Sequence, residues 1–296
     1  MLTIEKYAAI DIGSNAIRLL VANVIEQDNN PTLFKKNELI RVPIRLGEDV
    51  FSENSEISEK NIQRMLDAMQ AFRLLMNAHQ VKYYRACATS AMREAANGDI
   101  VVQMVKEKTS IEIEVIDGKE EASIIAATDL HSIIEKDRVY LYVDVGGGST
   151  ECTLYDQGKV KTSKSFKIGT VRILNNLVSE SIWESMSQWI TRETQMYSKI
   201  TVIGSGGNIN KIIKMSGKKS SKSLSYLNLL KFYRKLNDLS YDERVVKLGL
   251  NPDRADVIIP ALTIYMRAMK WSHAEHIVVP SIGLSDGIIK TLYKSK

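Results

Sequence analysis

Short apolar runs interrupted by turn residues make up the first part of the chain. The runs "KYAAID" and "AIRLLVANVIE" lie on either side of a Gly-Ser-Asn turn, and their apolar and β-branched content favours a hairpin. A third strand is expected in "NNPTLFKKNELIRVPI", where Asn29, Asn30 and Pro31 form the turn. The chain is therefore predicted to begin with consecutive strands.

The hydrophobic period then becomes helical. Apolar residues in "SEKNIQRMLDAMQAFRLLMNAH" recur at three- and four-residue spacing, and Ser58 is a natural N-cap. This stripe is expected to be core, and it comprises Ile62, Met65, Leu66, Met69, Phe72 and Met76. Beyond it we expect a strand in "VKYYRACA", a helix over about 91–108, a strand in "IEIEVI" and a helix over about 120–135.

The opening pattern then starts again. "AAIDIGSNAIRLLVANV" and "LYVDVGGGSTECTLYDQ" share an apolar-Asp-apolar-Gly core followed by an extended run, so Asp11 and Asp144 are equivalent positions. A third strand follows in "KVKTSKSFKIG", then a helix near 181–197, the strand "KITVIG" and the turn "GSGGN". A repeat of this size indicates duplication, and two copies facing each other would set two Asp-x-Gly turns across one cleft.

The remaining sequence is predicted to be mostly helical, with a last strand in "HIVVPS" and a terminal helix after "GLSDG". We expect an N-terminal domain over residues 1–124 and a second domain with helical additions over 125–296. The C-terminal helix, at about 284–296, is expected to pack back on the first domain.

Composition is that of an ordinary globular protein of 296 residues, with 44% hydrophobic and 25% charged residues. No apolar run approaches the roughly 18 residues of a membrane span, and the start lacks a signal-peptide pattern, so we expect a cytoplasmic location and no membrane partner. Cys87 and Cys152 lie in apolar runs typical of buried thiols in a reducing compartment, and the 4 histidines show no zinc-site spacing.

Charge is distributed unevenly. Residues 157–237 contain 15 Lys and Arg against three acids, a net +12, so the rest of the chain sums to −7 within the total of +5. The basic segment is either a solvated surface or an electrostatic path for a polyanion, and its place beside a glycine-rich turn favours the polyanion.

Three glycine turns follow strand-like runs. Gly146, Gly147 and Gly148, with Ser149 and Thr150 adding hydroxyls, could present several N–H groups to one phosphate. The turn over 12–15 would do the same in the first half, and 204–208 is a third example. A plain hairpin turn is the alternative for any one of them, but three in one chain favour phosphate binding.

Acids flank these turns. Asp11 and Asp144 end strands, where a carboxylate can hold Mg²⁺ beside a phosphate, or else cap the turn through an Asx hydrogen bond. Glu151 begins the next strand and is best explained as a metal or water ligand. In "DGKEEASII", Glu120 is expected to favour the helix dipole, whereas Glu121 could act as a general base.

Arginines complete the candidate site. Arg18 follows the first turn and Arg93 follows a strand end, and either could bind phosphate oxygens in bidentate fashion. The alternative for each is an ordinary surface salt bridge. Arg254 in "PDRADVIIP" is a weaker candidate of the same kind.

Motifs along nearly the whole chain resemble the Ppx/GppA phosphatases, which comprise exopolyphosphatases and guanosine pentaphosphate phosphatases. They are "AAIDIGSNAIRLLVANV", "RLGEDVF", "ATSAMREA", "IDGKEEASII", "VDVGGGSTE", "KIGTVRI", "IGSGGNINKI", "DRADVIIPA" and "GLSDGI". The resemblance implies an α/β fold of two ribonuclease H-like domains of the actin-like ATPase superfamily, flanking a central cleft. Longer members carry extra C-terminal helical domains, so this chain resembles a short, two-domain member.

The resemblance also implies residue roles. The family's catalytic glutamate falls on Glu121, its phosphate-gripping arginine on Arg93, and its metal and water-orienting acids on Asp144 and Glu151. Its phosphate loops fall on Gly13, Ser14 and Asn15 and on Gly146, Gly147, Gly148 and Ser149, and Arg18 corresponds to a position that faces the cleft.

The expected function is that of a phosphoanhydride hydrolase, an exopolyphosphatase that removes terminal phosphate from short polyphosphate with Mg²⁺, or Mn²⁺ in its place. Hydrolysis of guanosine pentaphosphate or another nucleotide is the alternative, and a guanosine polyphosphate sensor without turnover or a phosphotransferase of the same superfamily are rivals. No nucleic-acid partner is expected, and a homodimer is compatible with the sequence.

Overall fold

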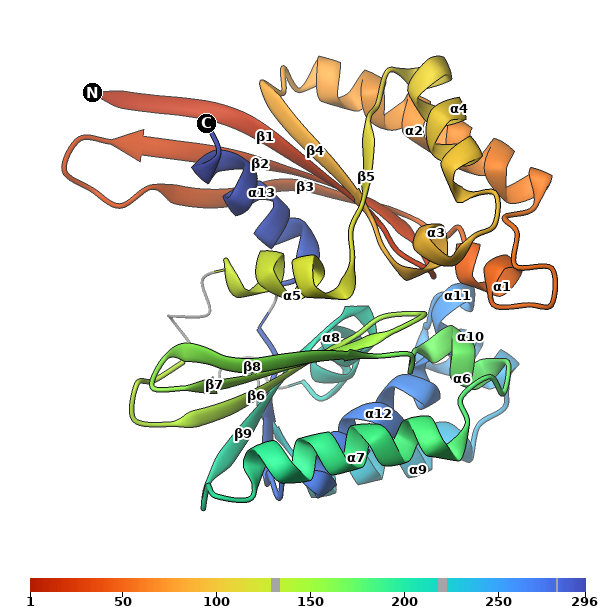
Figure 1. Cartoon of the computed structure of the whole chain (residues 1–296), viewed down its shortest axis with the longest axis vertical. Helices are drawn as coiled ribbons and strands as arrows, with labels where there is room; N and C mark the ends of the chain where they lie inside the picture. The colour runs from red at the N-terminus through yellow and green to blue at the C-terminus, as the bar shows by residue number, and fades with distance from the viewer. Residues whose placement is uncertain (129–133, 218–222, 281) are drawn as a thin grey trace. The chain divides into compact units, whose positions relative to one another are not determined.

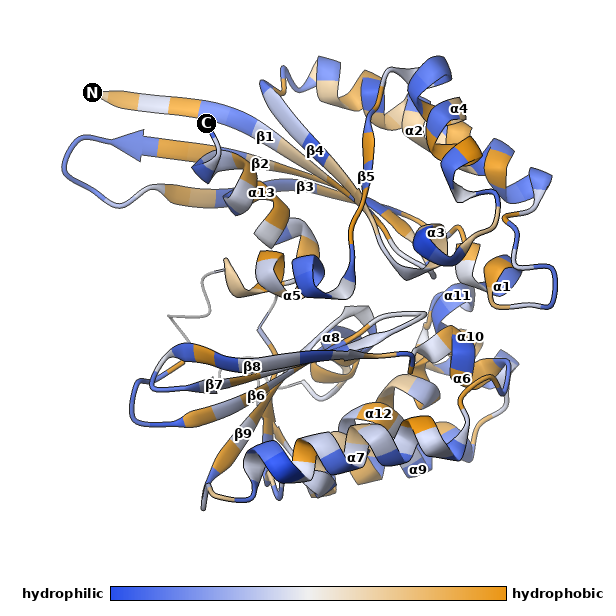
Figure 2. Ribbon diagram, in the orientation of Figure 1, coloured by the Kyte–Doolittle hydropathy of each residue, from blue (hydrophilic) through white to orange (hydrophobic). Residues whose placement is uncertain are grey.

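The computed structural model describes residues 1–128, 134–217, 223–280 and 282–296. They form two compact units, of which unit 1 consists of Met1–Thr128 and Gly283–Lys296 and unit 2 of Asp129–Ile282. Each unit combines one mixed β-sheet with helices (Figure 1). Apolar residues run along the strands of both sheets (Figure 2), and each unit has its own core.

Unit 1 is built on a sheet with the strand order β3-β2-β1-β4-β5. Strands β1 (Leu2–Ile12), β2 (Ile17–Gln27) and β3 (Leu33–Val42) form the antiparallel half expected from the opening pattern, whereas β4 (Tyr83–Ala88) and β5 (Ile113–Val115) run parallel to β1. The helices are α1 (Leu46–Val50), α2 (Glu59–Ala78), α3 (Ser90–Glu94), α4 (Gly98–Thr109), α5 (Gly118–Ala126) and α13 (Leu284–Lys294).

The end of β1 is buried on both faces, as is typical of a strand covered by helices on each side. Most of the predicted helical stripe is confirmed, because α2 buries Met65, Leu66, Met69, Phe72 and Met76, whereas Ile62 is half-buried. The predicted N-cap Ser58 is confirmed as well. The C-terminal helix α13 packs on β1, β2, β4 and α5. At Gly287 a Cβ atom would overlap the carbonyl of Ile124, so this glycine allows α5 and α13 to approach closely.

Unit 2 repeats this plan in a sheet ordered β10-β11-β9-β6-β7-β8. Its strands are β6 (Val139–Val145), β7 (Thr150–Asp156), β8 (Lys159–Phe166), β9 (Ile200–Ser205), β10 (Ser223–Ser225) and β11 (His276–Val278). Its helices are α6 (Thr170–Leu174), α7 (Glu180–Thr194), α8 (Gly207–Met215), α9 (Tyr226–Asn237), α10 (Tyr241–Leu248), α11 (Pro252–Ala255) and α12 (Ile258–Trp271). Helix α12 lies in the core with α7 and α8.

The two sheets share one topology. The order β8-β7-β6-β9-β11 matches β3-β2-β1-β4-β5, and Asp11 and Asp144 both occupy the penultimate position of the first strand of their sheet. The duplication predicted from the sequence is thus matched by the fold. None of the helices in the described part of the chain is long and apolar enough to cross a bilayer.

The single helix expected over 91–108 is wrong, because the structure breaks it into α3 and α4. Ala95 is extended, and the Asn97 side chain forms two hydrogen bonds of 2.9 Å with the backbone of Ile57. A Cβ atom on Gly98 would lie 2.5 Å from the carbonyl oxygen of Met92, so the turn requires glycine. The helix expected over 120–135 is α5, which begins earlier, at Gly118, and ends at Ala126. The expected second half is wrong at 127–128 and 134–135, which are not helical, and 129–133 lie outside the described residues.

Candidate functional site

The first glycine turn, over 13–15, connects β1 and β2 and is held by segments distant in sequence. The Gly13 N–H donates to the Ala16 carbonyl at 3.1 Å, and the Gly47 N–H of α1 donates to the Ser14 carbonyl at 2.8 Å. The hydroxyls of Ser14 and Ser90 lie 2.9 Å apart, and both residues are buried. Neither α1 nor Ser90 was singled out from the sequence as support for this turn.

Asp11 and Arg18 stand beside this turn and form an ion pair. They are directly opposite on β1 and β2, and Arg18 Nη1 lies 2.6 Å from Asp11 Oδ2. The Asp11 side chain is 8% exposed and the Arg18 side chain 29%. The sequence suggested a metal ligand at Asp11 and a phosphate ligand at Arg18. Those roles stay predictions, and the structure adds an ion pair between the two side chains.

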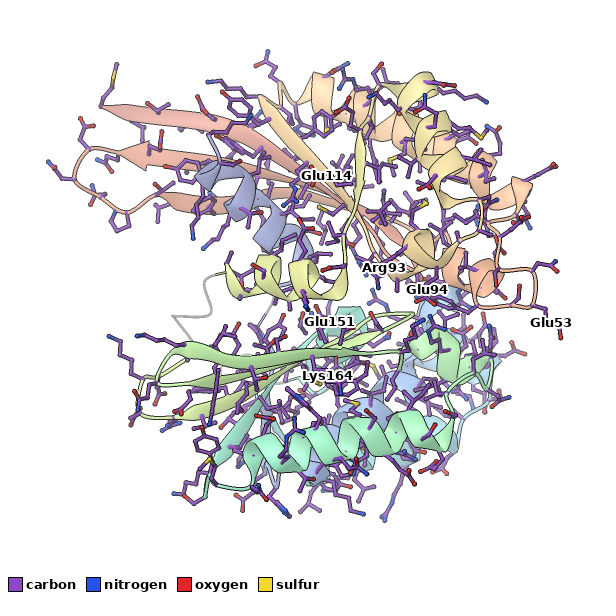
Figure 3. The ribbon with its side chains drawn as sticks, in the orientation of Figure 1. Glu53, Arg93, Glu94, Glu114, Glu151 and Lys164 are labelled. Atoms are coloured by element: carbon purple, nitrogen blue, oxygen red, sulfur yellow. The ribbon has the colours of Figure 1, made fainter. Side chains whose placement is uncertain are left out.

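Arg93 and Glu121 are both close to the start of α5. Arg93 projects from α3 (Figure 3), and its Nη1 donates to the Ile116 carbonyl at 2.6 Å. Asp117 caps α5, and the buried Glu121 lies in the first turn of that helix, with its N–H 2.9 Å from the Asp117 carbonyl oxygen. Arg93 therefore contacts the residue just before the cap of the helix that carries Glu121.

The beginning of α5 is further fixed by charge. Hydrogen bonds lower the pKa of the Asp117 carboxyl, chiefly the one from the Glu120 N–H, and the Arg93 charge adds to this effect. The Glu120 side chain pairs with Arg85 at 2.7 Å, and Arg85 also holds Glu114 at 2.6 Å. Glu120 thus lies in the first turn of α5, where its charge interacts favourably with the helix dipole, as the sequence predicted. Its ion pair with Arg85 was not predicted.

The second glycine turn, 146–148, connects β6 and β7 and rests on α6. Its carbonyl oxygens are engaged by that helix, since Thr170 N–H donates to Gly146 at 3.0 Å and Val171 N–H to Gly147 at 2.9 Å. The Arg172 Nε donates to the Gly148 carbonyl at 2.7 Å.

This arrangement orients the peptide groups. In a trans peptide the carbonyl and the following N–H point in opposite directions, so the N–H groups of Gly147, Gly148 and Ser149 point away from α6. Successive backbone N–H groups turned to one side of a tight turn can form an anion-binding nest. A Cβ on Gly169 would overlap the backbone of Gly147, so α6 approaches closely only because this residue too is glycine. Arg172 is buried and was not predicted as a site residue, although a basic residue among the apolar positions of "KIGTVRI" was a usable signal.

Polar side chains line up across the sheet next to this turn. Asp144 on β6 is opposite Ser205 on β9 and Glu151 on β7, and Glu151 is opposite Ser165 on β8. Glu151 is 2% exposed and accepts hydrogen bonds on Oε1 from Ser149 at 2.6 Å and from Ser165 at 2.9 Å. Figure 3 labels Glu151 on β7 and Lys164 on the neighbouring β8.

The acids of this row suit a hard divalent cation. Asp144 and Glu151 offer two adjacent carboxylates, and Mg²⁺ in proteins is commonly held by one or two carboxylates with water and phosphate completing its shell. No cluster of three or more His, Cys, Asp or Glu that could hold a metal occurs among the described residues. The fit to the expected magnesium ion therefore rests on the carboxylate pair alone.

The third glycine turn, 204–208, has glycines that packing requires. A Cβ on Gly204 would lie 2.6 Å from Ile277 Cδ1, and Gly206 has a φ of +119° with a Cβ position 2.9 Å from the Val145 carbonyl oxygen and 3.6 Å from Asp144 Oδ1. The Tyr265 hydroxyl donates to the Ser205 carbonyl. This turn thus packs against the strand end that carries Asp144.

Arg254 and the cysteines complete the candidates. The Arg254 guanidinium lies beside the start of α8, where a Cβ on Gly207 would be 3.2 Å from Arg254 Nη2. Cys87 and Cys152 are buried, and burial raises the pKa of both thiols, that of Cys87 to about 12. Both thiols are therefore expected to be unreactive.

The shared strand order and the paired Asp-glycine turns define a two-unit protein of the ribonuclease H-like, actin-like class. Within that class the chain belongs to the Ppx/GppA phosphatase family, whose sequence pattern matches residues 38–296. The resemblance seen in the sequence and the predicted fold class are thereby confirmed.

Relatives with assigned names are similar over most of this chain. It is 31% identical to a bifunctional 3-dehydroquinate synthase/phosphatase of Fusobacterium nucleatum over 93% of this chain and 46% of that protein. It is 25% identical to a putative exopolyphosphatase of Haemophilus influenzae over 99% of this chain and 93% of that protein. A guanosine-5'-triphosphate,3'-diphosphate pyrophosphatase of Photobacterium profundum is 27% identical over 96% of this chain and 58% of its own length. The chain therefore spans about half of the first and third of these relatives.

Solved structures share the fold. An exopolyphosphatase from Cytophaga hutchinsonii superposes with a TM-score of 0.84 at 23% identity, over 98% of each chain. The Ppx/GppA family member of Aquifex aeolicus gives a TM-score of 0.77 at 22% identity over 99% of each chain.

Proposed function

We propose that this protein is an exopolyphosphatase that hydrolyses the terminal phosphoanhydride of short inorganic polyphosphate and releases orthophosphate. The observation that carries the proposal is the turn 146–148, whose carbonyl groups are tied to α6 and whose N–H groups point the other way, beside the acid pair Asp144 and Glu151. Relatives named as exopolyphosphatases support it, including exopolyphosphatase 2 of Mycobacterium tuberculosis, 26% identical over 87% of this chain.

The predicted site residues have separate tasks in the proposed reaction. The N–H groups of the turn 146–148 bind phosphoryl oxygens, and the turn 13–15 provides a second set of donors. Asp144 and Glu151 would hold a divalent cation, Mg²⁺ or Mn²⁺, which when bound neutralises phosphate charge. Glu121 accepts a proton from the attacking water, and Arg93 stabilises negative charge on the phosphoryl group.

Charge supports a polyanionic substrate. Unit 2 contains the basic segment 157–237, with its net charge of +12, and β8 in that segment carries Lys159, Lys161 and Lys164. Phosphoryl transfer depends mainly on positioning and charge stabilisation, which a basic segment next to an N–H nest can provide.

Guanosine pentaphosphate is the second candidate substrate. Several relatives are named guanosine-5'-triphosphate,3'-diphosphate pyrophosphatase, among them that of Vibrio vulnificus, 24% identical over 95% of this chain. The chemistry at the phosphoanhydride would be the same, and only the group behind the terminal phosphate would differ. The cytoplasmic location, the lack of a nucleic-acid partner and the homodimer stay predictions.

The test compares substrates and one pair of variants. Phosphate release is measured from short polyphosphate, long polyphosphate, guanosine pentaphosphate and ATP, each with Mg²⁺ and with Mn²⁺. Short polyphosphate should be the best substrate, and Glu121→Gln should abolish turnover while substrate still binds. Glu120→Gln is the matched control, because Glu120 is adjacent but pairs with Arg85, and it should retain most activity.

The outcomes separate the proposals. Activity on guanosine pentaphosphate alone would transfer the assignment to the second candidate. Wild-type kcat in Glu121→Gln on every substrate would refute the role of Glu121, and tight nucleotide binding without phosphate release over hours would indicate a sensor. Formation of ADP only when a sugar or acid is supplied would indicate a phosphotransferase.

A further inference from the structure

Ser165 on β8 is bonded to a candidate metal ligand, and the reaction proposed above gives it no task. Its Oγ lies 2.9 Å from Glu151 Oε1, and Ser149 Oγ lies 2.6 Å from the same oxygen. A serine hydroxyl has one proton to donate, and an ionised carboxylate only accepts. Ser149, in the glycine turn, and Ser165, on β8, therefore both donate a hydrogen bond to Glu151 Oε1.

The strand register shows what this contact does. Glu151 is opposite Asp144 on one neighbouring strand and opposite Ser165 on the other. Directly opposite side chains have Cβ atoms roughly 4.5–5.5 Å apart, and like charges so placed repel. The bond from Ser165 ties Oε1 to β8, the strand on the far side of β7 from Asp144, so together with the bond from Ser149 it restricts the rotation of the Glu151 carboxylate.

We propose that Ser165 is a positioning residue, which fixes the Glu151 carboxylate for a divalent cation shared with Asp144. The inference rests on the proposed function for the presence of that cation, but not for the identity of the substrate. Hydrogen-bond partners that orient metal-ligating side chains are worth roughly 10–100-fold in metal affinity or activity. Ser165 is exposed, so its substitution is not expected to disturb the core.

The chain offers a matched control on the same strand. Ser163 is exposed as well, and its hydroxyl lies 2.9 Å from Thr153 Oγ1 on β7 and 3.3 Å from the Cys152 carbonyl oxygen. It faces Thr153 across the two strands as Ser165 faces Glu151. Ser163→Ala therefore removes the same atom from the same face of β8, at the next cross-strand pair on that face, where the partners are a hydroxyl and a backbone carbonyl instead of a carboxylate.

The experiment measures metal binding without substrate. Mn²⁺ binding to the full chain is followed by electron paramagnetic resonance, with Mg²⁺ as competitor, for wild type, Ser165→Ala, Ser165→Thr and Ser163→Ala. We expect Ser165→Ala to bind roughly tenfold more weakly, and the other two variants to match wild type. Thermal unfolding checks that all four proteins fold.

A second measurement follows phosphate release. Ser165→Ala should need a higher Mg²⁺ concentration for activity and regain most of its kcat at saturating Mg²⁺.

Each other outcome has a defined meaning. Equal Mn²⁺ affinity of Ser165→Ala and wild type, an equal loss in Ser163→Ala, or a loss in Ser165→Thr as large as in Ser165→Ala would overturn the inference. So would a wild-type protein that binds neither metal. A wild type that binds Mn²⁺ but hydrolyses no phosphoanhydride would refute the proposed function alone, because the comparison of metal affinities would still decide the role of Ser165.

Discussion

Arg18 Nη1 lies 2.6 Å from Asp11 Oδ2, and the two residues are directly opposite on β1 and β2 beside the first glycine turn. The positive charge of Arg18 balances the buried Asp11 carboxylate at the end of β1. Neither side chain can be assigned a task toward metal or phosphate without accounting for the other. We therefore expect that loss of one partner of the pair destabilises unit 1, whatever part the pair has in the reaction.

Removal of the Arg18 guanidinium alone should lower the stability of the protein. Arg18→Gln leaves the Asp11 carboxylate, 8% exposed, without its charged partner, and we expect a loss of about 1–3 kcal/mol in the free energy of unfolding. Urea denaturation measures this loss.

The double variant identifies the cause. In Asp11→Asn/Arg18→Gln the amide needs no counterion, so the double variant should be more stable than the sum of the single losses predicts. Additive losses would mean that the two residues act independently.

The register of this pair could have been read from the sequence, whereas other contacts could not. A hairpin turn over 13–16 pairs Ile12 with Ile17 and hence Asp11 with Arg18, so the signal was local. The strand pattern and the repeat were also sufficient for the fold class. In contrast, Asn97 breaks a predicted helix by bonding Ile57, and Arg172 and Ser165 reach the site through packing of α6 and β8. Such contacts depend on tertiary structure, which a local periodicity does not contain.

Gly169 should be intolerant of a methyl group. Its Cβ would overlap the backbone of Gly147, so Gly169→Ala must move either α6 or the turn 146–148. We expect a loss of about 1–3 kcal/mol in stability, as for other overpacked sites, together with weaker substrate binding seen as a raised KM.

Gly283 provides the control for this substitution. It has an ordinary extended backbone, and no atom lies within 4 Å of its Cβ position. Gly283 is the N-cap of α13, where alanine is less favourable than glycine, so Gly283→Ala should cost no more than about 1 kcal/mol. Similar losses of stability in Gly169→Ala and Gly283→Ala would show that the overlap with the Gly147 backbone does not cause the effect at Gly169.

Asp117 should make α5 sensitive to acid. Its carboxylate accepts the N–H groups of Lys119 and Glu120, which lowers its pKa in the folded protein. A lowered carboxyl pKa contributes stability that is present above the unfolded pKa, about 3.9, and is lost as the pH falls through the folded value. Asp117→Asn keeps an N-cap acceptor but has no charge.

The comparison is made by urea denaturation of wild type and Asp117→Asn from pH 7 to pH 3. Wild type should be the more stable protein at neutral pH, and the difference should shrink below about pH 4, because other carboxyl groups titrate alike in both proteins. A difference that does not change with pH would contradict a role for the charge.

Substitution of Arg172 tests whether hydrogen bonds from α6 orient the peptide groups of the turn 146–148. Its buried side chain donates to the Gly148 carbonyl at 2.7 Å, and that hydrogen bond helps to turn the next N–H, of Ser149, away from α6. Arg172→Met keeps much of the side-chain volume but removes the donor, so the carbonyl loses a charge-assisted hydrogen bond worth about 1.5–3 kcal/mol. If the turn binds phosphate through its N–H groups, kcat/KM should fall roughly 10–100-fold, the equivalent of that energy. Arg192→Met removes an exposed arginine of α7 that pairs with its neighbour Glu193, and it should leave kcat/KM unchanged. Equal activity of Arg172→Met and Arg192→Met would show that the turn keeps its orientation without support from α6.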